Sequence, residues 1–221
     1  MNISYIYNKV RRMAVVLPFF LLVSCPLFTS CTEEDSDDVE EFVDWKNKND
    51  QYFTNIYNTA KQKIAAGDTS WKIFRSWALI SDAATQPTDF IVVHVLEEGT
   101  GSGCPMYSDV TRVHYGGRLL PSTSYSDGYV FDSSWNGTYN AQSSKPSDLS
   151  VTGTVVGWAT ALMQMHIGDR WEVYIPYTLG YGTSNTTNTA GYVTIPAYST
   201  LIFDIRLVAF WRADGDVPEM K

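Results

Sequence analysis

The predicted fold is organised around one short apolar segment, Val155-Val156-Gly157-Trp158-Ala159-Thr160-Ala161-Leu162-Met163-Gln164-Met165. Trp158, Leu162 and Met165 stand at i, i+4 and i+7, so they share one face of a short helix. Residues 167–169 end the helix, and from there to residue 175 apolar and polar side chains alternate, which predicts a strand. A short helix that lies on a sheet and carries a tryptophan in its first turn could form the floor of a pocket, and the alternative from this segment alone is a core tryptophan without a ligand.

The N-terminus has the organisation of a secretory signal peptide. A basic segment precedes an apolar run at 14–23, which is too short to span a bilayer comfortably. Small residues precede a cysteine at Cys25 and at Cys31, and both places resemble the lipobox of bacterial lipoproteins, in which the cysteine is lipidated. We favour Cys31 because an acidic segment similar to some surface-export signals follows it, and Cys25 is the alternative. We therefore predict a signal peptide at 1–30 and an acidic tether at 31–38.

The charge balance argues against several classes of partner. The net charge is −8, and loss of the signal peptide would remove three positive charges and bring it to −11. Such a protein repels phosphates, so we expect no nucleic-acid partner and a membrane contact only through the lipid anchor. His94, His114 and His166 are scattered without metal-ligand spacing, so we predict neither a metal nor a cofactor. The mature chain would keep one free thiol, Cys104, which cannot form a disulfide framework.

A long helix is predicted at 39–66, followed by a strand at 71–79. Asp37 or Asp38 would cap the start of the helix, and Gly67 suits its C-terminal end. The apolar stripe along this helix could pack on the following domain, or on a second copy of the chain in a homodimer. The residues of the stripe keep spacings of three and four and are Phe42, Trp45, Asn49, Tyr52, Phe53, Ile56, Tyr57, Ala60 and Ile64.

The main domain is predicted at 90–212, between a helical extension with its connecting strand at 39–89 and a polar tail at 213–221. Many short strands joined by turns, with one short helix, predict an antiparallel α+β fold. Gly116-Gly117 suggests a bend or bulge. Strands are expected at 90–96, 110–120, 170–175 and 198–208. Loops are expected at 121–128 and 183–190, and residues 135–150 are expected to form a variable loop and an edge segment.

Five segments of this domain, taken in order, resemble the FKBP-type peptidyl-prolyl cis-trans isomerases. They are Val113-His114-Tyr115-Gly116-Gly117-Arg118-Leu119, Phe131-Asp132-Ser133-Ser134, the run from Val155 to Arg170, Ile175-Pro176-Tyr177-Thr178-Leu179-Gly180-Tyr181-Gly182, and the run from Ile195 to Asp204. The resemblance implies an FKBP-like fold, a twisted antiparallel sheet wrapped on one short helix and here preceded by a long N-terminal helix.

The same resemblance implies a set of site residues. Trp158 would form the floor under a proline ring, and Tyr181 would offer its hydroxyl to the substrate carbonyl. The backbone N–H of Ile195 would hold the residue before proline, and Asp132 would be a buried acceptor that orders Tyr115. The catalytic set is thus Tyr115, Phe131, Asp132, Trp158 and Tyr181. The substrate-binding set is Val155, Val156, Ile195 and Phe203.

The resemblance implies isomerisation of Xaa-Pro bonds, and the signal peptide indicates exported proteins as substrates. From the predicted lipid anchor we expect a location in the cell envelope, at the outer membrane or cell surface in preference to the inner membrane. The chain departs from the family near Ser147 and Leu149, where an aromatic wall is usual, at Thr194, and in two longer loops, 120–128 and 183–194. These departures motivate an alternative, a non-catalytic FKBP-like peptide-binding or chaperone lipoprotein. The many Trp and Tyr residues motivate another, a glycan-binding lipoprotein.

Overall fold

The computed structural model describes residues 40–219, which fall within one compact unit. The predicted signal peptide, its cysteines Cys25 and Cys31, and the acidic tether lie outside the described residues. Neither α-helix of the described part is both long and apolar enough to cross a membrane.

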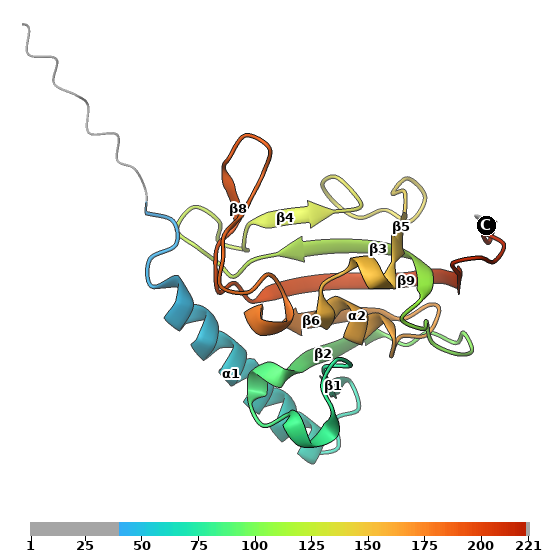
Figure 1. Cartoon of the computed structure of the whole chain (residues 1–221), viewed down its shortest axis with the longest axis horizontal. Helices are drawn as coiled ribbons and strands as arrows, with labels where there is room; N and C mark the ends of the chain where they lie inside the picture. The colour runs from blue at the N-terminus through green and yellow to red at the C-terminus, as the bar shows by residue number, and fades with distance from the viewer. Residues whose placement is uncertain (1–39, 220–221) are drawn as a thin grey trace, which may run out of the picture. The chain divides into compact units, whose positions relative to one another are not determined.

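Residues 40–219 form two α-helices and nine strands (Figure 1). The helices are α1 (Trp45–Ala65) and α2 (Val156–Leu162). The strands are β1 (Trp71–Arg75), β2 (Phe90–Glu97), β3 (Asp109–Arg118), β4 (Val130–Ser133), β5 (Ser147–Ser150), β6 (Arg170–Ile175), β7 (Thr186–Thr187), β8 (Val193–Ile195) and β9 (Leu201–Arg212).

Seven strands form one sheet in the order β1-β2-β6-β9-β3-β4, with β5 paired to β3. Every pairing is antiparallel, and β9 is central because it pairs with β6 on one side and β3 on the other. β7 and β8 form a separate two-stranded hairpin. The predicted antiparallel α+β class is confirmed.

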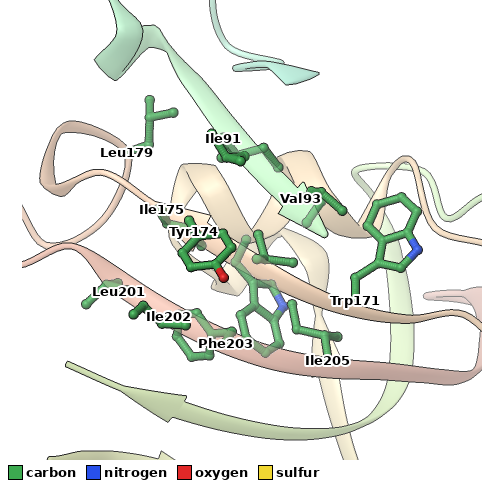
Figure 2. Close-up of a cluster of buried hydrophobic side chains, with 14 of the residues drawn as sticks. Ile91, Val93, Trp171, Tyr174, Ile175, Leu179, Leu201, Ile202, Phe203 and Ile205 are labelled. Carbon is green, nitrogen blue, oxygen red and sulfur yellow. The ribbon is translucent and has the colours of Figure 1, made fainter. Parts of the chain in front are cut away.

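One face of the sheet packs against α2. Alternation along β6 turns Trp171, Val173 and Ile175 to this face, and all three are buried. Gly157 lets the helix lie directly on the sheet, because a Cβ there would stand 2.3 Å from Cγ2 of Ile175. Figure 2 shows the buried hydrophobic cluster, to which β2, β6 and β9 contribute side chains, with Phe203 on β9.

The opposite face of the sheet is covered at one end by α1. Tyr174, which alternates to this face, lies with its ring centroid 6.3 Å from that of Tyr52 on the helix. Phe53 is only 2% exposed, whereas Ile64 near the end of the helix is 42% exposed. Of the two alternatives for the apolar stripe, the structure shows packing on the chain's own domain.

Two elements are shorter than predicted: α1 begins later than expected, and β1 ends earlier than expected. α1 begins at Trp45 because residues 41–44 form a turn and Asp44 adopts a left-handed backbone conformation with φ 52°. The predicted strand at 71–79 ends at Arg75, where Ser76 donates its backbone N–H to Asp89 and the chain turns. The expected glycine at the helix end is confirmed, since Gly67 has φ 86°.

Two predictions near the C-terminus are corrected. The last strand begins at Leu201 rather than at 198, because Tyr198 has φ 65°, which is incompatible with an extended strand. The strand also continues past 208 to Arg212, where it still pairs with Asp109 of β3. The expected loop at 183–190 contains the short strand β7. Its polar Thr and Asn residues show no alternation of apolar and polar side chains, so the sequence does not indicate a strand there.

The predicted boundary between residues 89 and 90 does not separate two compact units. β1 pairs with β2 along its whole length, from Trp71 opposite His94 to Arg75 opposite Phe90. The helix and strand of the extension are therefore part of the same sheet-and-helix unit as the main domain.

Truncation of the α1 contact tests this organisation. We expect Phe53→Ala to lower the free energy of unfolding by roughly 3–5 kcal/mol, since it removes a buried aromatic ring from the face of the sheet. Ile64→Ala on the same helix should cost less than about 1 kcal/mol, because its side chain is largely exposed. Urea unfolding of both variants measures the difference, and equal effects would contradict the packing described.

Candidate active site

A cavity of about 340 Å³ opens beside the first turn of α2. This size falls within the range of about 300–1,000 Å³ that is usual for small-molecule and peptide side-chain pockets. Strands β3, β4, β5 and β9, the segment before α2 and the loop after β6 contribute its walls. The lining residues are Tyr115, Phe131, Asp132, Leu149, Gly153, Thr154, Val155, Trp158, Tyr181 and Phe203.

Four aromatic rings meet edge-to-face around this cavity. The ring of Trp158 is 3% exposed, and its centroid lies 5.2 Å from that of Tyr115 and 4.5 Å from that of Phe203. Phe131 meets Phe203 at 5.4 Å with an interplanar angle of 88°. Perpendicular rings place positive edges on negative faces, which fixes their orientation as well as burying area. The cavity therefore has rigid, apolar walls.

Gly117 on β3 makes room for two of these walls. A Cβ at this position would stand 2.4 Å from Cε1 of Phe203 and 2.7 Å from Cζ of Phe131. Such distances are far inside ordinary contact, so any larger residue would push both rings toward the cavity or tilt them. The absence of a side chain here is a requirement of the aromatic arrangement.

The hydroxyl of Tyr115 donates a hydrogen bond of 2.9 Å to Oδ2 of Asp132. Burial, followed by this hydrogen bond and the carboxylate charge, raises the pKa of Tyr115 above its usual value. The phenol therefore stays protonated and its ring stays oriented. The expectation that Asp132 would be buried is wrong: it is exposed, because β4 is the edge strand of the sheet and the carboxylate lies at the rim.

Tyr181 lies at the mouth of the cavity. It follows a 3-10 turn at Tyr177–Leu179 that a hydrogen bond from Gly182 N to Tyr177 O closes at 2.9 Å. Its side chain is 45% exposed, and burial of the rest, together with the charge of Asp132, raises its pKa. A neutral phenol at this place can donate a hydrogen bond to a ligand that enters the cavity.

The structure brings seven of the nine predicted residues to this one cavity; Val156 and Ile195, the second of which was predicted to act through its backbone N–H, are not among the lining residues. Val156 begins α2 but does not line the cavity, and Ile195 is 4% exposed in β8. The prediction missed Gly153 and Thr154, which precede the helix in a 3-10 turn at 151–153 that has no apolar period. Leu149, at one of the two positions where an aromatic wall was expected to be missing, lines the cavity with an aliphatic side chain.

Three further observations concern groups that do not line the cavity. No residue of α1 is among its lining residues, so the N-terminal helix does not cover it. Within residues 40–219, no group of three or more His, Cys, Asp or Glu side chains is arranged to hold a metal ion. Cys104 is a free thiol whose Sγ lies 3.7 Å from Nε2 of His166, away from the cavity.

Comparisons with known proteins point to one family. Residues 102–208 match the FKBP-type peptidyl-prolyl cis-trans isomerase family. The chain is 38% identical over 128 residues to a macrophage infectivity potentiator of Trypanosoma cruzi, covering 58% of this chain and 56% of that protein. It is also 38% identical over 114 residues to the FKBP-type 22 kDa peptidyl-prolyl cis-trans isomerase of Escherichia coli, covering 52% of this chain and 47% of that protein.

A third relative is the outer membrane protein MIP of Legionella longbeachae, 34% identical over 119 residues, which are 54% of this chain and 43% of that protein. The chain thus spans about half the length of these relatives. The matched region holds the strands, the short helix and the aromatic cavity described above. Residues 102–208 belong to the FKBP-type peptidyl-prolyl cis-trans isomerase family.

Proposed function

We propose that this chain is a peptidyl-prolyl cis-trans isomerase that acts on Xaa-Pro bonds of exported proteins. The observation that carries the proposal is the edge-to-face set of Tyr115, Phe131, Trp158 and Phe203 around one cavity, with the hydroxyl of Tyr181 at its mouth. Relatives named as isomerases of this type support it.

Rotation about a prolyl bond needs neither a nucleophile nor an acid. The uncatalysed barrier is about 20 kcal/mol, and a turnover of about 10³ per second requires a barrier near 13 kcal/mol, so the site must supply about 6–7 kcal/mol. At the twisted transition state the amide loses conjugation and polarity. An apolar cavity that excludes water favours this state over the planar ground state.

Each wall has a proposed part in this stabilisation. The ring of Trp158 supports the proline ring from below, while Phe131 and Phe203 enclose its sides. Tyr181 donates its hydroxyl to the substrate carbonyl at the mouth. Tyr115 is held upright by Asp132, which orders the rim and takes no proton from the substrate. The backbone N–H of Ile195 and the side chains of Val155 and Val156 are proposed to contact the residues beside the proline.

The place of action that we propose is the cell envelope, with attachment through a lipid on Cys31 or, as the alternative, Cys25. The apolar run at 14–23, the small residues before each cysteine, and a relative named as an outer membrane protein support this proposal. A homodimer through the N-terminal helix stays a prediction. The buried face of α1 packs on its own sheet, so a dimer would have to use the exposed face of the helix.

The first test is catalysed cis-to-trans isomerisation of Leu-Pro and Phe-Pro peptides by the full chain. We expect acceleration, and we expect Tyr181→Phe to lower kcat/KM by about tenfold, the value of one lost hydrogen bond in a partly buried site. Tyr192→Phe, on an exposed tyrosine outside the cavity, is the matched control and should change nothing. Peptide binding without acceleration would instead favour the non-catalytic alternative.

The space over β3 gives a second prediction. Gly117→Ala should lower kcat/KM by about tenfold or more, because its methyl group displaces Phe131 and Phe203. Gly153→Ala, at the cavity edge, places its Cβ 4.0 Å from the nearest atom and should change the rate by about twofold at most. Equal kinetics for the two variants would show that the tilt of these walls does not matter.

The tyrosine hydroxyls give a third prediction, on pH. The pKa values of Tyr115 and Tyr181 are both raised from 10.0, and a raised pKa keeps a phenol protonated to higher pH. Both donors are therefore intact in neutral and mildly alkaline solution. We expect kcat/KM to stay constant from about pH 7 to about pH 9.5 in stopped-flow assays. A loss of activity centred well below about pH 10 in folded protein would contradict the assignment.

A further inference from the structure

We infer that Trp45 and Asn49 of the N-terminal helix are positioning residues for the active site, acting through the segment 196–200 on Tyr181. The kinetic part of this inference rests on the proposed function, whereas its structural part does not. It assigns α1 a part in the site although no residue of that helix lines the cavity.

The first step is the attachment of α1 to the segment 196–200. Nε1 of Trp45 donates to Oγ of Ser199 at 2.8 Å, and the backbone N–H of Thr200 donates to Oδ1 of Asn49 at 2.7 Å. All four residues are buried, with Asn49 and Thr200 each 1% exposed. A buried donor or acceptor that loses its partner is strongly unfavourable, so these two bonds fix the segment to the helix.

The network is completed on both sides by further polar contacts. Oγ of Ser199 in turn donates to the carbonyl of Pro196 at 2.7 Å, which closes the turn. Nδ2 of Asn49 donates to the backbone carbonyl of Trp45 at 2.7 Å, which fixes the amide so that its oxygen faces Thr200. Every polar atom of the Asn49 side chain thus has a defined role in this attachment.

The second step links the segment to the mouth of the cavity. Tyr198 has φ 65°, a conformation that non-glycine residues keep only when their surroundings hold it. Its backbone N–H donates to the carbonyl of Gly182 at 2.9 Å, the residue next to Tyr181. Its ring packs edge-to-face on Tyr177 with centroids 5.2 Å apart, so it touches both ends of the turn that carries Tyr181.

The helix also reaches Tyr198 directly. Nζ of Lys46 lies over the ring of Tyr198, 5.4 Å from its centroid, which is within the range of a cation–π contact. The segment then continues into β9, where Phe203 is a wall of the cavity. Figure 1 shows the start of α1 near the place where β9 begins. Position is thus passed from α1 to the mouth and to one wall.

The test compares Trp45→Phe and Asn49→Ala with Ala60→Gly in the full chain. Phe keeps an apolar ring without the N–H, and Ala removes the acceptor of Thr200. Ala60 is buried on the same helix, about 22 Å further along, so its replacement weakens the helix without touching segment 196–200. We expect the Tyr198 amide to exchange with deuterium about tenfold faster in the two test variants than in the control.

The kinetic arm separates positioning from a general loss of stability. In the same three proteins we expect kcat/KM to fall about five- to tenfold in Trp45→Phe and Asn49→Ala and to be nearly unchanged in Ala60→Gly. In a double-mutant cycle, Asn49→Ala should cost much less once Tyr181→Phe is present, because both changes weaken the same contact.

The outcomes that would overturn the inference are distinct from failure of the proposed function. Exchange of the Tyr198 amide that follows only global stability, equal in all three variants, would overturn it. Additive effects of Asn49→Ala and Tyr181→Phe would also overturn it. A full chain without any isomerase activity would refute the proposed function alone, and the exchange rates would then decide the inference by themselves.

Discussion

The cavity depends on the close approach of α2 to the sheet at Gly157. A Cβ there would meet Ile175 at 2.3 Å, so only glycine lets the helix lie low enough for Trp158 to meet Phe203 at 4.5 Å between centroids. Gly117 on β3 also has no side chain, which leaves room for the rings of Phe131 and Phe203 to pack over the strand. Glycine at these two positions therefore permits the close contacts between the floor and the walls of the cavity.

This arrangement suits the proposed function, which needs no reactive group. The walls are buried and half-buried rings fixed by perpendicular packing, and the polar groups at the rim are the carboxylate of Asp132 and two phenols, Tyr115 and Tyr181, whose pKa values are raised. In the proposed function, a rigid apolar cavity would offer its stabilisation before the substrate arrives, so that little free energy would be lost to reorganisation when the amide twists. The side chain of Leu149 makes one part of the lining aliphatic.

The N-terminal extension is part of the same unit. β1 adds a strand to the sheet and α1 covers the face opposite α2, so both faces of β2 and β6 are buried. The attachment of α1 to the segment before β9 uses buried polar bonds rather than apolar contacts alone. Polar bonds of this kind fix a geometry as well as adding stability, which suits a segment that borders a site.

Periodicity in the sequence predicts the antiparallel class, the short helix and the central strand, because it records which side chains share a face. Seven of the cavity residues were predicted from the resemblance of five segments to one family. The sequence did not determine that Asp132 would be exposed, that Val156 and Ile195 would lie outside the cavity, or that Tyr198 would interrupt the last strand. These features depend on contacts between distant parts of the chain. The carboxylate of Asp132, for example, is exposed because β4 lies at the edge of the sheet. The left-handed conformation of Tyr198, likewise, is held by Gly182, a residue distant in sequence.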